Sequence, residues 1–206
     1  MQTIKINPRK INKYNLEFIA DNFKEKKVIV YPAETIYGIG GIASDNRVIK
    51  KIYKLKKRDT SKTFIILVGS FCMLKKYFFV NAKQDKFLRN VWPKPFGTKR
   101  VRPTTVILKS RGILPKVLEK NSTIAVRLPM ANQWGRDFLI PLIKKIDEPI
   151  ISTSLNISGQ KPIDDLKNIE KIFPQVDLVV DRGKLPSRRP SRIIDLTDIE
   201  NVKIIR

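Results

Sequence analysis

Residues 28–41 (VIVYPAETIYGIGG) constrain the fold of this chain more than any other stretch. The first three are a β-branched run of the kind that fits a buried strand. Pro32 cannot donate a ladder hydrogen bond, so this strand should end there or lie at a sheet edge. Three glycines, at positions 38, 40 and 41, allow another backbone or a ligand to approach closely. The stretch therefore predicts a strand, a polar turn and a glycine-rich return. This unit is either a pocket wall or an ordinary hairpin, and its spacing alone favours the hairpin.

Strand-like runs and amphipathic segments alternate along the rest of the chain. Helical patterns cover residues 12–24, 44–56, 70–80, 85–91, 133–146 (with a kink at Pro141) and 164–173. Strand patterns cover residues 64–68, 104–109, 123–128, 149–152, 176–180, 193–196 and 202–205. No internal repeat or long linker separates them. We therefore expect a single α/β domain over residues 1–206, in which helices flank one twisted mixed sheet.

Lys56 stands out in the second helical pattern, whose apolar stripe contains Ile49, Ile52 and Tyr53. Continuing this stripe by three or four residues reaches Lys56, so its side chain should point toward the core. An inward ammonium group needs an anion or a carbonyl as partner. The alternative is a lysine whose stem packs while its ammonium reaches water, and periodicity alone slightly favours that alternative.

Charge suggests one class of function. The chain has 42 Lys and Arg against 19 Asp and Glu, a net charge of +23, and such a surface attracts polyanions. A basic RNA-binding factor of tRNA or ribosome maturation is thus one hypothesis, and its RNA affinity would fall steeply with salt. However, an AT-rich coding sequence also enriches Lys, Ile and Asn, and no RNA-recognition motif with interleaved aromatic residues is found.

Composition excludes several kinds of site. The chain has no histidine, which rules out histidine triads, histidine general bases and histidine-ligated metals. Cys72 is the one cysteine, so no internal disulfide can form, and a cytoplasmic location is expected. No segment approaches the roughly 20 apolar residues that span a bilayer. The glycines of the central stretch lack the following Gly-Lys-Ser/Thr of a P-loop, which argues against a Walker-type ATPase.

Five motifs follow one another along the chain: YPAETIYGIG (31–40), KLKKR (54–58), IAVRLP (124–129), STSLNISG (152–159) and PSRIID (190–195). This ordered set resembles the YrdC/TsaC family, the threonylcarbamoyl-AMP synthases, in its short single-domain form. Three departures are visible. Ala33 replaces the usual threonine, Thr63 stands where proline or glycine is common, and an insertion at 94–101 interrupts the motif before Thr105.

The resemblance implies a YrdC-like fold with a basic concave pocket and a defined reaction. L-threonine, bicarbonate and ATP would form threonylcarbamoyl-AMP and pyrophosphate, for threonylcarbamoyl modification of adenosine 37 in tRNAs reading ANN codons. Mg²⁺ would accompany ATP, with no permanently bound cofactor. A downstream threonylcarbamoyl transferase complex would take the product, weak tRNA or RNA binding is conceivable, and no membrane partner is expected. Related carbamoyl-adenylate chemistry, as in hydrogenase maturation, occurs in much larger multi-domain chains.

The same resemblance implies roles for individual residues. Lys56 and Arg58 would contact the triphosphate and carry the catalysis, which relies on positioning and electrostatics and needs no histidine. Further ATP contacts would come from Thr105, Ser154, Asn156, Ser191 and Arg192. Threonine would be held by Thr35, Lys62 and Arg127, with Arg127 pairing the carboxylate. The resemblance implies no metal ligand in the protein itself.

Overall fold

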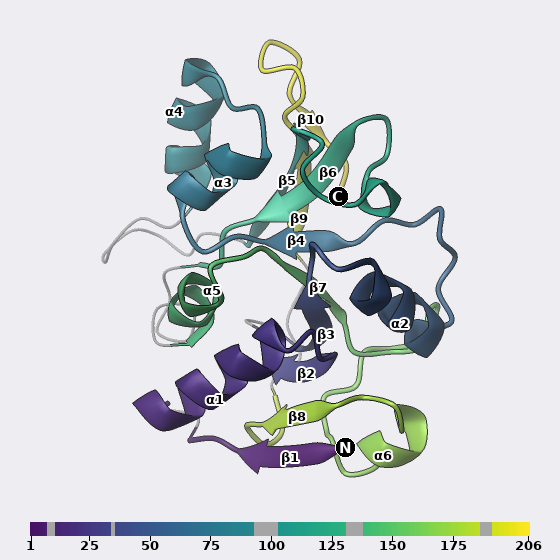
Figure 1. Ribbon diagram of the computed structural model, residues 1–206. Coiled ribbons are helices and arrows are strands. Elements are labelled where there is room, and N and C mark those ends of the chain that lie inside the picture. The colour runs from purple at the N-terminus through teal and green to yellow at the C-terminus, as the bar shows by residue number, and fades with distance from the viewer. Residues whose placement is uncertain (8–10, 34–35, 93–102, 131–137, 186–190) are drawn as a thin grey trace.

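The computed structural model describes residues 1–7, 11–33, 36–92, 103–130, 138–185 and 191–206. In this part of the chain, a ten-stranded mixed sheet has the order β1-β8-β2-β3-β7-β4-β6-β5-β9-β10 (Figure 1). Its strands are β1 (Gln2–Lys5), β2 (Ile29–Pro32), β3 (Tyr37–Ile42), β4 (Ile65–Leu67), β5 (Thr104–Lys109), β6 (Thr123–Arg127), β7 (Ile150–Ser154), β8 (Leu178–Asp181), β9 (Arg192–Asp195) and β10 (Lys203–Ile204). The α/β class and the mixed sheet predicted from the sequence are confirmed.

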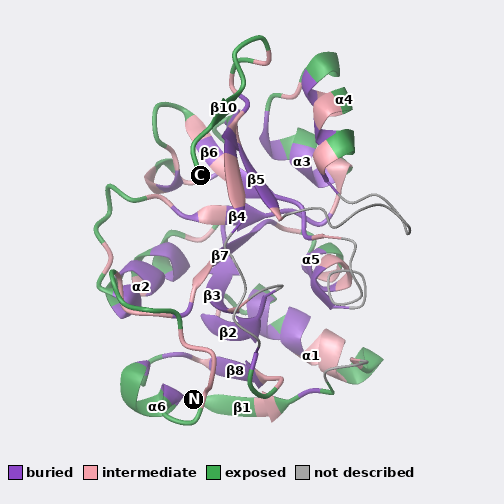
Figure 2. Cartoon of the chain, turned by 180° about the vertical axis from the view of Figure 1, so that it is seen from behind, coloured by how far each residue is buried: buried purple, intermediate pink, exposed green. Residues whose placement is uncertain are grey.

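Helices flank the strands. They are α1 (Lys13–Lys24), α2 (Asn46–Lys56), α3 (Phe71–Tyr77), α4 (Ala82–Val91), α5 (Ile140–Ile146) and α6 (Ile169–Ile172), with a 3₁₀ turn at Lys116–Leu118. α1 packs against α5 on one side of the central strands, and α2 lies on the other side (Figure 1). Buried residues fill the middle of the molecule along β2, β3 and β7 (Figure 2). Within the described residues, we find no helix that is both long and apolar enough to cross a membrane.

Side-chain caps fix where the two long helices begin. The Asn12 side chain accepts a hydrogen bond from the Asn15 N–H at 2.7 Å, before the first residue of α1. The Asp45 carboxylate accepts from the N–H groups of Arg47 and Val48 at the start of α2. These hydrogen bonds satisfy N–H groups that the first helical turn leaves unpaired. α2 then ends at Lys56, directly before the left-handed residue Lys57.

The glycine-rich return is the second strand of an antiparallel hairpin, in which Pro32 pairs with Tyr37 and Ile29 with Gly40. β3 also pairs with β7 on its other side, so its backbone is enclosed between two strands. A Cβ atom on Gly40 would lie 1.9 Å from the carbonyl oxygen of Ile151, a distance no side chain can adopt. Gly40 is therefore required by strand packing.

Some segments differ from the sequence predictions. β1 was not predicted, because its residues are mostly exposed and it joins the sheet through backbone pairing with β8. The helix expected over 164–173 is reduced to the single turn of α6. Of the helix expected over 133–146, residues 133–137 lie outside the described part. Pro141 stands in the first turn of α5, where proline needs no kink.

Candidate functional site

A pocket of about 340 Å³ lies where β3, β4, β6 and β7 meet the end of α2 and the start of β9. Its polar lining comprises three guanidinium groups and five hydroxyl groups. These belong to Arg58, Arg127 and Arg206, and to Thr63, Ser152, Thr153, Ser154 and Ser191. No Asp or Glu side chain of the described residues lines it. An excess of cationic and hydroxyl donors suits an anionic ligand.

Lys56 joins two of the sequence motifs beneath this pocket. It is 1% exposed, so the inward direction predicted by the apolar stripe is confirmed, whereas the alternative in which the ammonium reaches water, which periodicity alone slightly favoured, is wrong. The Nζ atom donates to the main-chain carbonyl of Ser154, to the carbonyl of Asn156 at 2.8 Å and to the Asn156 Oδ1 at 3.0 Å. The three ammonium hydrogens thus have three oxygen acceptors in the motif that follows β7. Of the two partners expected for an inward lysine, an anion or a carbonyl, Lys56 therefore has carbonyl oxygens.

Ser154 and Asn156 are also linked to each other. The Ser154 hydroxyl donates to the Asn156 Oδ1 at 2.6 Å, and the Asn156 Nδ2 donates to the Gln160 carbonyl at 2.7 Å. Ser154 lines the pocket, whereas Asn156 supports the loop behind it. The Ser158 N–H donates to the Lys56 carbonyl at 2.8 Å, so helix and loop are joined by main chain as well.

Burial lowers the pKa of Lys56 to about 7, and the nearby positive charge of Arg58 acts in the same direction. The three oxygen acceptors around Nζ favour the protonated form and oppose this effect. A polyanion bound in the pocket would raise the pKa again.

Arg58 lines the pocket from the segment after α2. Its Nε donates to the Lys62 carbonyl at 2.8 Å and one terminal nitrogen donates to the Thr63 carbonyl at 2.9 Å. The guanidinium carbon lies 5.2 Å from the centre of the Phe64 ring, a cation–π distance. These contacts hold the group at the pocket wall, and partial burial lowers its pKa. The Lys62 side chain itself is exposed and does not line the pocket.

Arg127 reaches the pocket from the end of β6, where it pairs with Leu67 of β4. It is buried, with 9% of its surface exposed. Tyr31 lies in the core behind it, and burial raises the pKa of that phenol to about 12. The Tyr31 hydroxyl donates a hydrogen bond to the Ile151 carbonyl at 3.4 Å. It also interacts with the side chain of Ser152, which lines the pocket. A deep guanidinium among hydroxyls suits a small carboxylate ligand.

The PSRIID motif completes the far wall. Thr105 and Ser191 share a hydrogen bond between their hydroxyl oxygens at 3.0 Å, and both are buried. Parallel pairing of β5 with β9 places these residues side by side. Arg192 contacts the Thr104 hydroxyl at 3.4 Å. Ser191 lines the pocket, whereas Thr105 and Arg192 support the wall from behind.

The structure therefore brings most of the predicted site residues to one place. Four of them line the pocket: Arg58, Arg127, Ser154 and Ser191. Lys56, Asn156, Thr105 and Arg192 contact other site residues or adjoin the wall. The Thr35 prediction lies outside the described residues. The direct ligand contacts implied for all these residues stay predictions.

Sequence reasoning missed four polar residues of the lining. Thr63 was noted only as a departure from the family pattern and was given no role. Ser152 and Thr153 stand in a motif that was recognised, but no role was given to them. Arg206 stands outside every motif, and it reaches the pocket because β10 pairs antiparallel with β9. Only the long-range strand pairing reveals its position.

Two further observations concern the surroundings of this site. A pocket of about 570 Å³ lies beside β1, β8 and α6, but its lining mixes acidic and basic residues and includes none of the predicted site residues. Among the described residues, no group of three or more His, Cys, Asp or Glu is arranged to hold a metal ion.

Comparisons with known proteins define the family. The family model Sua5_yciO_yrdC, described as "Telomere recombination", matches residues 21–206. The chain belongs to the Sua5/YciO/YrdC family. Structural matches in this family cover the whole chain. Pyrococcus abyssi Sua5, solved with L-threonine, has a TM-score of 0.83 at 25% identity, and Escherichia coli YciO has a TM-score of 0.81 at 26% identity.

The lengths of these Sua5/YciO/YrdC relatives differ. The chain covers 94% of E. coli YciO but 57% of the P. abyssi Sua5 chain, so it spans little more than half of that longer protein. A relative from Dichelobacter nodosus, named threonylcarbamoyl-AMP synthase, is 28% identical over 169 residues, which are 82% of this chain and 83% of that protein. E. coli YciO is named an uncharacterized protein, so relatives with and without a named activity share this fold.

Proposed function

We propose that this chain is an L-threonylcarbamoyladenylate synthase, a nucleotidyl-transfer enzyme. The observation that carries the proposal is the pocket lined by three arginines and five hydroxyl groups. Lys56 holds the STSLNISG motif beside this pocket through hydrogen bonds. The name of the D. nodosus relative and the L-threonine complex of P. abyssi Sua5 support the reaction class. The product would serve threonylcarbamoyl modification of tRNA.

The proposed chemistry needs charge and alignment. Threonine and bicarbonate lose water to form a carbamate, and a carbamate oxygen then attacks the α-phosphorus of ATP. The bond from that phosphorus to the bridging oxygen breaks, and pyrophosphate leaves. Negative charge accumulates on the phosphoryl oxygens, where guanidinium groups and hydroxyl donors stabilise it. Mg²⁺ would enter with ATP, held by phosphate oxygens and water.

Each residue has a place in this scheme. Arg58 contacts the triphosphate, and the buried Arg127 pairs with the carboxylate of threonine. Ser154 and Ser191 donate to the nucleotide. Lys56, Asn156, Thr105 and Arg192 position these groups through the hydrogen bonds described above. Binding then aligns carbamate and α-phosphate.

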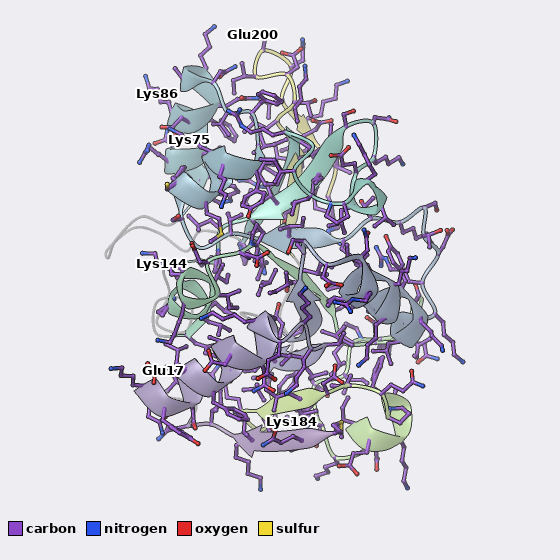
Figure 3. All side chains as sticks on the ribbon, in the orientation of Figure 1. Glu17, Lys75, Lys86, Lys144, Lys184 and Glu200 are labelled. Carbon is purple, nitrogen blue, oxygen red and sulfur yellow. The ribbon has the colours of Figure 1, made fainter. Side chains whose placement is uncertain are left out.

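A basic RNA-binding factor is the second candidate, and the distribution of charge bears on it. Labelled lysines on α3, α4 and α5, and Lys184 after β8, lie over separate parts of the molecule (Figure 3). Several charges are already paired, as in Lys145 with Glu17 at 2.9 Å and Lys51 with Asp177 at 2.7 Å. An electrostatic RNA footprint needs clustered free cations on one face. The named activity of the D. nodosus relative and the L-threonine complex of P. abyssi Sua5 favour the enzyme over this second candidate.

Incubation with ATP, bicarbonate and isotope-labelled threonine tests the proposal. A product with the mass of threonylcarbamoyl-AMP, formed together with pyrophosphate and dependent on all three substrates, is expected. Binding of RNA should be weak in comparison and independent of threonine. If no such adenylate forms while a salt-sensitive RNA complex does, the RNA-binding hypothesis replaces the synthase.

A further inference from the structure

We infer that the amino-acid subsite of the pocket also accepts L-valine, and that the chain forms the valine analogue of threonylcarbamoyl-AMP with the same loss of water and pyrophosphate. This inference rests on the proposed function. Ala33 is the residue that carries it. It is buried, with 6% of its surface exposed, and it lines the pocket at the position of the motif where threonine is usual. Its side chain is a single methyl group, which offers a ligand no hydrogen bond.

A niche in the pocket lies directly above Gly38, on the strand that runs between β2 and β7 (Figure 1). Its size follows from the place that a Cβ atom would take on this glycine. That place is 3.4 Å from the Thr153 carbonyl oxygen, 3.5 Å from the Ser152 Oγ and 3.6 Å from the Ala33 Cβ. These are ordinary van der Waals distances, so the niche has room for one carbon atom of a ligand.

The niche lies near the group that pairs with the carboxylate of the amino acid. Burial raises the pKa of the Tyr31 phenol, while Ser152 and the charge of Arg127 act against that rise, so both lie close to it. A small amino acid whose carboxylate pairs with Arg127 can therefore direct its side chain into the niche. Of the two γ atoms of a β-branched side chain, one then faces the Ala33 methyl group and the other faces the Ser152 hydroxyl.

Threonine and valine have the same shape and differ by a hydroxyl in place of a methyl group. A site rejects such an analogue strongly only when the missing hydroxyl leaves a polar group of the protein unpaired. Here the Ser152 hydroxyl already has Tyr31 as a partner, and the Thr153 carbonyl belongs to the ladder between β3 and β7. Ala33 has no polar group to leave unpaired, whereas a threonine at this position would add one. The niche therefore tolerates valine.

The test compares the wild type with Ala33→Thr and with a matched control, Ala82→Thr. Ala82 is exposed at the start of α4 and does not line the pocket. The synthase assay measures kcat/KM for L-threonine and for L-valine, with each adenylate identified by its mass, and calorimetric titration measures Kd for both amino acids. We expect the wild type and Ala82→Thr to prefer threonine by less than about a hundredfold, and Ala33→Thr to increase that preference about tenfold or more.

Gly38→Ala is a second variant, because its methyl group fills the niche itself. It should lower the affinity for threonine and for valine alike, by about tenfold or more. Thermal unfolding of all variants should be close to that of the wild type, so that these losses report on binding. An unchanged affinity for both amino acids in Gly38→Ala would show that their side chains do not enter the niche.

The possible failures can be told apart. If the wild type forms the threonine adenylate but its preference over valine exceeds the limit given above, the inference is refuted while the proposed function stands. The same holds if Ala33→Thr leaves that preference equal to that of Ala82→Thr. If neither amino acid yields an adenylate, yet both bind with Kd values that Ala33→Thr separates, the niche stands and the proposed function fails.

Discussion

Lys56 and Asn156, 100 residues apart in the chain, are joined by two hydrogen bonds from one ammonium group, to the main-chain carbonyl at 2.8 Å and to the side-chain oxygen at 3.0 Å. This link fixes the loop after β7 to the end of α2. It explains why a lysine stands at a position of the helix that the apolar stripe assigns to the core. The ammonium donates to three partly buried acceptors, which folding has removed from much of the surrounding water.

Replacing Lys56 with alanine should therefore destabilise the protein as well as the site. The change leaves the main-chain carbonyls of Ser154 and Asn156 without the Lys56 donor, while the Asn156 Oδ1 keeps the Ser154 hydroxyl. We expect this to cost about 2–4 kcal/mol of unfolding free energy. Lys54→Ala, on the exposed side of the same helix, should change it by less than about 0.5 kcal/mol. Urea unfolding measures both variants. Equal stability of Lys56→Ala and wild type would show that the link is not formed in solution.

The pH dependence of stability offers a second test. With a folded-state pKa of about 7 against an ordinary 10.5, Lys56 is neutral in the folded chain and protonated in the unfolded chain between these values. The unfolded state then binds more protons, so the unfolding free energy rises with pH in this window. At about 1.4 kcal/mol per pH unit, the rise from pH 7 to pH 9 should be about 2 kcal/mol.

The chain suits this measurement because it has no histidine to titrate near pH 7. Lys56→Met provides the control, since every other ionisable group is retained. The unfolding free energy of Lys56→Met should rise less between pH 7 and pH 9 than that of the wild type. If plots of unfolding free energy against pH are parallel for the two proteins in this range, the pKa of Lys56 is not lowered.

Loss of the Arg58 guanidinium should impair ATP use specifically. Arg58→Ala removes a charge-assisted contact worth about 1.5–3 kcal/mol, which corresponds to a reduction of tenfold to more than a hundredfold in kcat/KM for ATP. Arg58→Lys should recover only part of it, because lysine lacks the planar fork. Lys57→Ala, the exposed neighbour, is the matched control. Pyrophosphate release gives the rates, and undiminished release by Arg58→Ala would remove Arg58 from the site.

Alanine substitution should lower the stability strongly at one of the two glycines that flank Ile39 and only slightly at the other. At Gly40 a Cβ atom would lie 1.9 Å from the Ile151 carbonyl oxygen, so Gly40→Ala must push β3 away from β7 and should cost about 3 kcal/mol or more. At Gly38 the nearest atom would be the Thr153 carbonyl oxygen at 3.4 Å, an ordinary contact, so Gly38→Ala should change stability by less than about 1 kcal/mol. Thermal or urea unfolding distinguishes them. Similar losses at both positions would contradict this register of β3 on β7.

Local patterns in the sequence predicted much of the fold because they reflect local physics. The direction of Lys56 toward the core follows from the apolar stripe of its helix. The hairpin reading of the central stretch and the pocket-wall reading are both correct, since Gly40 is enclosed by strands while Gly38 lines the pocket.

Long-range pairing was beyond the reach of these patterns. β1 joins β8 through its backbone, which leaves little trace in the side chains. Which oxygens meet the Lys56 ammonium depends on where β7 ends relative to α2, and Arg206 reaches the pocket only through the pairing of β9 and β10. Such contacts follow from the whole sheet and cannot be read from any short segment.

The parallel pairing of β5 with β9 has a consequence for synthesis on the ribosome. Thr105 emerges long before Ser191, yet the two hydroxyls form one wall of the pocket. A nascent chain that has already produced α2, β6 and β7 still lacks this wall. On the proposed function, this site could use ATP only after β9 has been synthesised, because a chain that stops before Ser191 lacks one wall of the pocket.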